Sequence, residues 1–161
     1  MSTNNAINQI GKLPSFMAVQ NADQTNVTGD GSAYVPQYTN VIYDITGSFN
    51  GSTTFTAPLS GKYLFDFTFQ FTGVTAAMTL GYIQLITTAA TYNIFYSNPA
   101  NLRGNNNVFS YSTCILCNMT ATDTASLSMA FLNGTKVATL QGATISGVRA
   151  PMFAGYMITG I

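Results

Sequence analysis

Charge is scarce in this sequence of 161 residues: only 6% of the residues are charged, and both Glu and His are absent. An ordinary globular protein has about 25% charged residues. The net charge is zero and the five cations are scattered along the chain, so no basic surface follows a phosphate backbone and we expect no nucleic-acid partner. Without His or Glu, a His-based catalytic triad and a His/Glu metal site are excluded. Such sparse charge cannot cover a folded surface, which indicates that part of the surface is buried between subunits.

Long apolar runs are also missing. No run reaches the roughly 18 to 20 residues that cross a bilayer, so we expect no membrane insertion. Residues 1–12 are polar and lack the hydrophobic core of a signal peptide. We expect them to form a flexible lead-in or linker, and residues 13–161 to form one domain. Such a chain would be a cytoplasmic product, a mature fragment or a piece of a longer virion protein.

Only two cysteines are present, Cys114 and Cys117, with CxxC spacing. A redox CxxC needs a helix N-terminus, and a zinc site needs two further ligands that this sequence does not offer. In an extended strand the two Cα atoms would lie about 10 Å apart, which is too far for a disulfide. We therefore interpret them as two buried thiols in a strand.

Thr and Asn are abundant, with 23 and 15 residues, and both are typical of strands and turns. No ten-residue window shows helical periodicity with caps. Short strands with no helix between them favour a sandwich or jelly roll. Alternation and turn residues predict strands at 15–20, 38–45, 53–56, 61–72, 78–88, 92–96, 108–118, 124–132 and 152–159, with a loop at 21–37.

Residues 63–71 have the sequence YLFDFTFQF, with an aromatic residue at every odd position. Successive side chains of a strand point to opposite faces, so we expect the five rings to lie in the interior of a sandwich. Their burial would contribute on the order of 20 kcal/mol before the entropy cost. The opposite face has a single charge, and it suits contact with copies of the same chain better than contact with water.

The stretch SFNGSTTFTAPLSGKYLFDF resembles the signature of the complement C1q globular head, which belongs to the tumour necrosis factor (TNF)-like jelly rolls. PSFMA at 14–18, NVIYD at 40–44, ATDTASLSM at 121–129 and MFAGYMI at 152–158 are similar to further segments of the family, in the same order. The positions that match the central signature are Asn50, Phe55, Thr56, Ala57, Pro58, Gly61, Tyr63 and Phe65.

The resemblance implies an all-β, ten-stranded jelly-roll sandwich that assembles as a compact homotrimer, with the long strand and the last strand in the sheet that faces the threefold axis. The chain departs from the family because it has no collagen repeat and no Trp. Its uncharged, Thr/Asn-rich composition is more similar to phage and virus fibre proteins. The residues expected at the trimer interface are Leu64, Asp66, Thr68, Gln70, Phe153 and Tyr156.

A saccharide site needs aromatic side chains beside amide and hydroxyl donors. Packing in the core or between subunits is the alternative for these tyrosines. The candidate ligand-binding residues are Tyr92, Asn93, Tyr96 and Tyr111, together with Tyr82.

A structural cation such as calcium prefers carboxylate and carbonyl oxygens. Asp23, Asp30 and Asp66 are the candidate ligands, and turn formation is the alternative for the first two. No other cofactor is expected.

We interpret the chain as a non-enzymatic trimeric head that trimerises a viral or phage fibre or tailspike, located in the virion or outside the cell. Binding of a host-surface receptor or saccharide is a further expectation. The alternative is a secreted complement- or cytokine-like ligand-binding or signalling domain. A saccharide-degrading enzyme would need paired Asp residues in a cleft.

Overall fold

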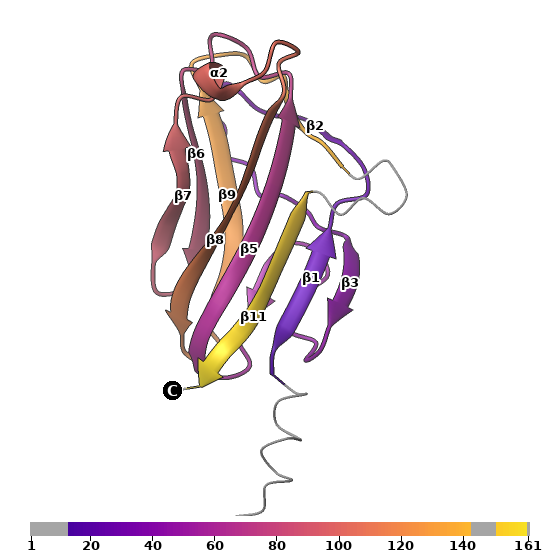
Figure 1. Ribbon diagram of the computed structural model, residues 1–161, viewed down its shortest axis with the longest axis vertical. Coiled ribbons are helices and arrows are strands. Elements are labelled where there is room, and N and C mark those ends of the chain that lie inside the picture. The colour runs from indigo at the N-terminus through magenta and orange to yellow at the C-terminus, as the bar shows by residue number, and fades with distance from the viewer. Residues whose placement is uncertain (1–12, 143–150, 161) are drawn as a thin grey trace, which may run out of the picture.

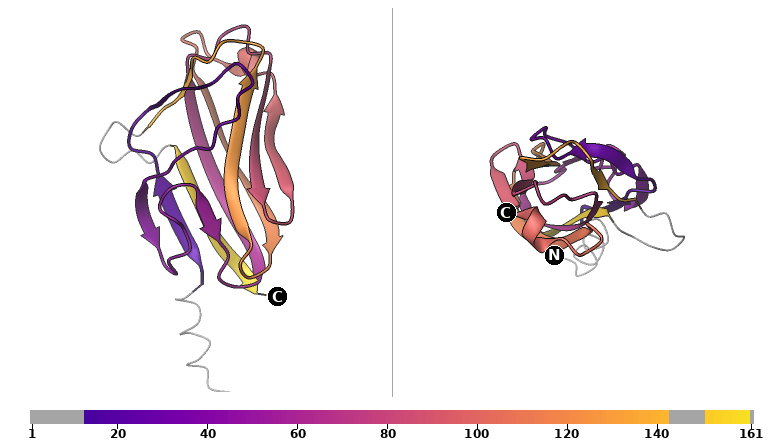
Figure 2. Two further views of the ribbon diagram at one scale, coloured as in Figure 1. Left: turned by 180° about the vertical axis from the view of Figure 1, so that it is seen from behind. Right: turned by 90° about the horizontal axis from the view of Figure 1, so that it is seen from above.

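The computed structural model describes residues 13–142 and 151–160. These residues form two antiparallel sheets that pack face to face, with one short helix at the upper end of the molecule (Figure 1). The view from above shows the two sheets enclosing a common interior (Figure 2). The lead-in expected at 1–12 lies outside the described residues.

The larger sheet, sheet A, contains seven strands around the long strand β5. The smaller sheet, sheet B, has the order β4-β9-β6-β7. The strands of sheet A are β1 (Ser15–Val19), β2 (Gln24–Thr28), β3 (Asn40–Asp44), β5 (Gly61–Thr72), β8 (Phe109–Met119), β10 (Ala138–Leu140) and β11 (Met152–Gly160). The strands of sheet B are β4 (Thr54–Thr56), β6 (Leu80–Thr87), β7 (Thr91–Ser97) and β9 (Thr124–Leu132).

Strand β5 is the centre of sheet A because it is hydrogen-bonded along both edges. Strand β8 pairs with it in unbroken register from Gly61 to Phe71. On the other edge, β11 pairs with the first part of β5 and β10 pairs with its end. Beyond β11 come β1 and β3.

The aromatic ladder of β5 lies in the interior, as the alternation predicts. Its five rings are at most 2% exposed, and they pack against rings from other strands. Phe67, for example, stacks on Phe153 of β11, and Phe71 packs against Phe131 of sheet B. The five rings are those of Tyr63, Phe65, Phe67, Phe69 and Phe71.

The described residues contain eleven strands, whereas the resemblance implies ten. Two of the eleven strands, β2 and β10, were not predicted from the sequence. Strand β2 lies inside the predicted loop at 21–37, and β10 has only three residues. In β2 the alternation is lost, because its two buried residues are adjacent and Asn26 has a φ of 52°. Strand β10 alternates, but over three residues only. The two strands exist because they pair with each other, and β10 also pairs with β5.

The single short helix was predicted only as a turn at Asn98-Pro99. Helix α2 (Pro99–Leu102) begins at Asn98, whose side chain accepts a hydrogen bond from the backbone N–H of Asn101. Asn is a favoured N-cap and Pro a favoured first helical residue. No helix among the described residues has the length and apolarity needed to span a membrane.

Candidate functional site

The outer face of β5 is the first candidate site, because it carries the predicted interface residues. Leu64, Asp66 and Thr68 are half-buried, and Gln70 is exposed. In the register of the sheet, Asp66 lies opposite Cys114 of β8 and opposite Ala154 of β11. Asp66 is the one carboxylate on β5, β8 and β11.

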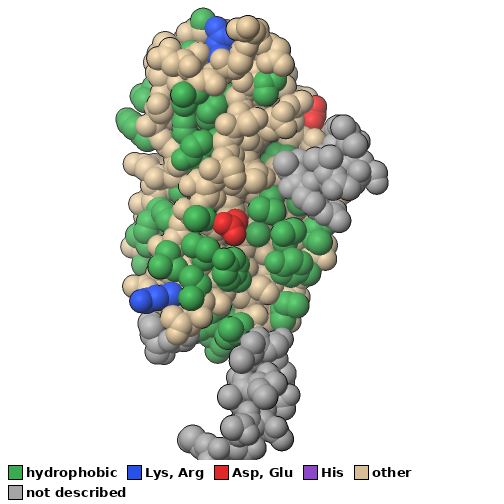
Figure 3. Space-filling view, in the orientation of Figure 1, with side chains coloured by type: hydrophobic (Ala, Val, Ile, Leu, Met, Phe, Trp, Pro, Cys, Tyr) green, Lys and Arg blue, Asp and Glu red, His purple; other side chains and the backbone are tan. Residues whose placement is uncertain are grey.

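Large apolar side chains surround this carboxylate on the neighbouring strands. Figure 3 shows one acidic group within a field of hydrophobic side chains over the lower half of sheet A. Such a patch, exposed on a chain with very few charges, indicates an interaction surface. We call this surface the sheet A face. Its exposed apolar side chains are Val41, Tyr43, Ile45, Leu116, Tyr156 and Ile158.

The edge of the sheet A face is formed by β8, whose outer edge has no strand partner. Among the described strands, β8 forms a backbone ladder with β5 alone. Natural sheets protect long edges with Pro, Lys or bulges. Strand β8 has eleven residues, no Pro and no charge, and its register with β5 is unbroken. This edge is therefore open to association with another molecule.

One predicted interface residue is wrongly placed. Phe153 is fully buried and packs against the rings of Phe16 and Phe67, so it belongs to the core. Tyr156 lies opposite Leu64 and is exposed on the sheet A face, as expected. The two positions are three residues apart, and an odd separation within a strand places side chains on opposite faces.

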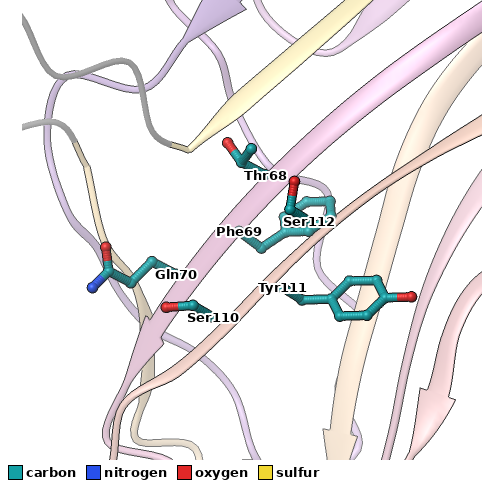
Figure 4. A pocket seen from close by; sticks show the side chains of 6 residues that line it. All are labelled: Thr68, Phe69, Gln70, Ser110, Tyr111 and Ser112. Carbon is teal, nitrogen blue, oxygen red and sulfur yellow. The ribbon is translucent and has the colours of Figure 1, made fainter.

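The upper part of the sheet A face is polar and slightly hollowed. A depression of about 340 Å³ lies between β5 and β8. The side chains of Thr68, Gln70, Ser110 and Ser112 line it, while Tyr111 points away to the other side of the strands (Figure 4). The Thr68 hydroxyl oxygen is buried without a hydrogen-bond partner among the described residues. The face therefore has an apolar lower part and a hydroxyl-rich upper part.

The four predicted ligand-binding residues fall into two groups. Tyr92 and Tyr111 are only partly exposed and pack against the hydrophobic core. The Tyr111 hydroxyl donates a hydrogen bond of 2.8 Å to the Ile94 carbonyl, and burial raises the pKa of Tyr92. These two tyrosines therefore pack in the core, which is the alternative to ligand binding given above. Asn93 and Tyr96, in contrast, are exposed on the outer face of sheet B.

A bulge in β7 places Asn93 and Tyr96, which are three residues apart, on the same face of sheet B. The register between β6 and β7 shifts between Ile83 and Gln84, and Ile94 and Phe95 are both buried. Asn93 is consequently paired with Gln84, to which it is hydrogen-bonded at 2.8 Å. The sequence analysis did not identify Gln84, because its role appears only when β6 and β7 are aligned.

The turn alternative describes Asp30, whereas Asp23 is hydrogen-bonded to a residue far away in the sequence. Asp23 accepts a hydrogen bond from the backbone N–H of Gly142, and Asp30 accepts one from Ser32. Asp44 and Asp123 likewise accept backbone N–H groups in their own turns. The Ser32 hydroxyl and backbone hold the pKa of Asp30 below its usual value.

The structure does not bring the candidate cation ligands together. Asp23 precedes β2 and Asp30 follows it, so the two lie at opposite ends of that strand. Asp66 is on the sheet A face. Among the described residues, no group of three His, Cys, Asp or Glu side chains could hold a metal ion.

The two cysteines are free and lie on opposite faces of β8. Cys117 is buried, and burial raises the pKa of its thiol to about 11. Cys114 is exposed on the sheet A face, although a buried thiol was expected. The thiols are separated by the sheet itself, which agrees with the prediction that they do not pair.

Solved structures share this architecture. The globular domain of the zebrafish complement 1qA protein superimposes with a TM-score of 0.61, over 92% of this chain and 99% of that chain, at 17% identity. The fold is a C1q/TNF-like jelly roll. Murine APRIL superimposes on the same jelly roll with a TM-score of 0.57, over 90% of this chain and 98% of that chain, at 10% identity. No family model and no curated protein matches the sequence.

This result confirms the fold expected from the resemblance. The signature residues occupy the β4-to-β5 segment, where Phe55, Tyr63 and Phe65 form one ring cluster. At these low identities the similarity of the jelly rolls concerns the fold alone.

Proposed function

We propose that the protein is a non-enzymatic ligand-binding head that works as a homotrimer, assembled through the sheet A face and the β8 edge. The observation that carries this proposal is the apolar, almost uncharged sheet A face beside a long edge strand without protection. The solved structures that share the fold are C1q and TNF-like ligand domains. They favour the complement- or cytokine-like alternative over a fibre or tailspike head.

The geometry of the two surfaces supports a ring rather than a twofold dimer. A twofold dimer buries the same patch on both copies, whereas contact between two different patches closes into a ring. Here an apolar face and an open strand edge adjoin each other and differ in chemistry. The resemblance implies that the ring contains three copies, which would present three equivalent sets of binding surfaces and gain avidity.

The structural roles of the carboxylates support a non-enzymatic function. Four of the five Asp side chains accept backbone N–H groups, three of them within turns and Asp23 from the distant Gly142. The fifth, Asp66, is the one carboxylate on β5. Four of the carboxylates thus have structural roles, which argues against the converging Asp pair that a saccharide-degrading enzyme needs.

A fibre or tailspike head in a virion remains the second candidate. It is favoured by the low charge and by the Thr- and Asn-rich composition. Both candidates use the same assembly, and both act outside the cell or on a particle surface.

Assembly is tested with the substitution Leu116→Lys. Leu116 is 51% exposed on the sheet A face, whereas Leu102 is 55% exposed on helix α2, so Leu102→Lys is a matched control. Sedimentation velocity should give the wild type and Leu102→Lys about three times the 17.1 kDa monomer mass. An unpaired buried charge costs about 3–5 kcal/mol, so Leu116→Lys should weaken association more than 100-fold.

Two results would contradict the proposal. A wild-type protein that stays at 17.1 kDa at micromolar concentration does not form the trimer. A Leu116→Lys trimer of unchanged stability places the interface somewhere other than the sheet A face.

A further inference from the structure

The outer face of sheet B carries three ordered rows of side chains across β9, β6 and β7. Each row contains one residue from each strand, because the registers of both pairings align them. Neighbouring rows lie about 7 Å apart, two residues along β6 and β9. Along β7 the first two rows are three residues apart because of the bulge. The rows are Ala130–Tyr82–Tyr96, Ser128–Gln84–Asn93 and Ser126–Ile86–Thr91.

The first row presents aromatic surface. Tyr96 is 63% exposed, more than any other large hydrophobic side chain of the described residues. Tyr82 is its direct partner on β6. Among the described residues, the hydroxyls of both tyrosines have no hydrogen-bond partner. A tyrosine in this state offers a ring face to an apolar surface and a hydroxyl to a polar one.

The second row presents amides in a fixed arrangement. The side-chain amide of Gln84 donates to the side-chain oxygen of Asn93 at 2.8 Å. Each amide group has one carbonyl oxygen and two N–H donors, so the pair still offers an acceptor and donors to a ligand. The mutual hydrogen bond holds both side chains in place, which lowers the entropy cost of binding. Ser128 adds a hydroxyl beside them.

The strands of sheet B carry no charged side chains. None of the strands β4, β6, β7 and β9 contains Asp, Lys or Arg. Recognition of a sulfated or carboxylated ligand uses Arg or Lys, and these strands provide neither. A partner must therefore be uncharged, with an apolar side for the tyrosines and hydroxyl groups for the amides.

We infer that the outer face of sheet B binds a neutral saccharide, with a sugar ring packed on Tyr96 and Tyr82 and its hydroxyls bonded by Gln84 and Asn93. This inference names the ligand class of the proposed binding head and rests on that role, but it does not require assembly, since every contact lies within one copy. Sheet B forms the opposite side of the sandwich from the sheet A face (Figure 2), so a trimer formed through sheet A leaves it free.

The test uses defined probes on the whole protein. Neutral hexasaccharides of α-glucan, β-glucan, mannan, galactan and chitin are titrated into isotope-labelled protein and followed by NMR. At least one should shift the side-chain amide signals of Gln84 and Asn93. Tyr96→Ala should then weaken its binding roughly five- to tenfold, and Asn93→Ala should also weaken it. Leu102→Ala is the control, because Leu102 is an exposed apolar residue on helix α2, outside both the sheet A face and the three rows of sheet B.

Several outcomes overturn the inference. They are the failure of all five saccharides at millimolar concentration, equal binding by Tyr96→Ala and the wild type, and preferential binding of heparin, polygalacturonate or a proline-rich peptide. Sedimentation of the same samples separates this failure from failure of the proposed assembly. If the protein is a trimer that does not bind the saccharides, only the saccharide inference is disproved. If it is a monomer that binds them, only the proposed trimer is disproved.

Discussion

Gly155 in the middle of β11 provides a quantitative test of how the core is packed. The registers place it between Phe16 of β1 and Phe65 of β5, with all three residues facing the interior. A Cβ atom at Gly155 would lie 2.6 Å from one carbon of the Phe65 ring and 2.8 Å from one carbon of the Phe16 ring. Gly within a strand often marks such a close approach of neighbouring groups.

Gly155→Ala should therefore destabilise the protein by overpacking. Ordinary contact of a Cβ atom begins near 3.4 Å, so the Phe65 ring would have to move by about 0.8 Å. That ring is fully buried and already packs against Phe55 and Phe153, so it cannot move alone. Overpacking costs about 1–3 kcal/mol, and Ala regains about 0.5–1 kcal/mol over Gly in a strand. Because the new Cβ would lie within 3 Å of two buried rings, the overpacking cost should be near the upper end of its range, which leaves a net loss of about 2 kcal/mol.

The loss is measured by urea unfolding followed by far-UV circular dichroism, at one protein concentration because association would raise the apparent stability. For a domain of this size, the melting temperature should fall by about 4–8 °C. Gly104→Ala is the control, since its Cβ would meet only the end of the Asn106 side chain, at 3.2 Å. It should change stability by less than about 0.5 kcal/mol.

A double-mutant cycle shows whether the Phe65 ring causes the loss. Phe65→Leu removes ring atoms near the new Cβ, so Gly155→Ala should cost less in that background, with a coupling of at least about 0.5 kcal/mol. The reasoning is refuted if Gly155→Ala is as stable as the wild type, or if the two substitutions are strictly additive.

Two further predictions concern titratable groups. The Ser32 hydroxyl favours the carboxylate form of Asp30, so this interaction stabilises the fold above the usual pKa of 3.8 and is lost as the pH falls through the lower pKa of the folded state. An NMR titration of Asp30 should give a midpoint below 3.8, and the midpoint should rise in Ser32→Ala. A wild-type midpoint at or above 3.8 would contradict this prediction. Burial raises the pKa of the Cys117 thiol to about 11, so at pH 8 iodoacetamide should modify Cys114 and leave Cys117 intact until the protein unfolds. Dilution below the dissociation range of the proposed trimer should accelerate the reaction of Cys114, and a rate that does not depend on concentration would argue against burial of the sheet A face.

Local alternation along the chain was sufficient to predict much of the fold. The period of two in residues 63–71 places five rings inside and Asp66 outside, because neighbouring side chains of a strand point to opposite faces whatever lies beside them. The placement of Cys114 and Cys117 on opposite faces follows from the same rule. Phe153 should have followed from it too, since its odd distance from Tyr156 excludes a common face.

The pairing of strands was decided only by the tertiary structure. Strands β2 and β10 are too short and irregular to be visible in the sequence, and they form because each supplies the other's hydrogen bonds. The bulge in β7 depends on its register with β6, and it is this bulge that buries Ile94 and Phe95 together and leaves Asn93 and Tyr96 exposed. The rows on sheet B therefore lay beyond sequence reasoning, because Tyr82 and Tyr96, or Gln84 and Asn93, become neighbours only through hydrogen bonds between separate strands. A side chain's face is a local property of one strand, whereas its neighbours across the sheet are set by long-range pairing.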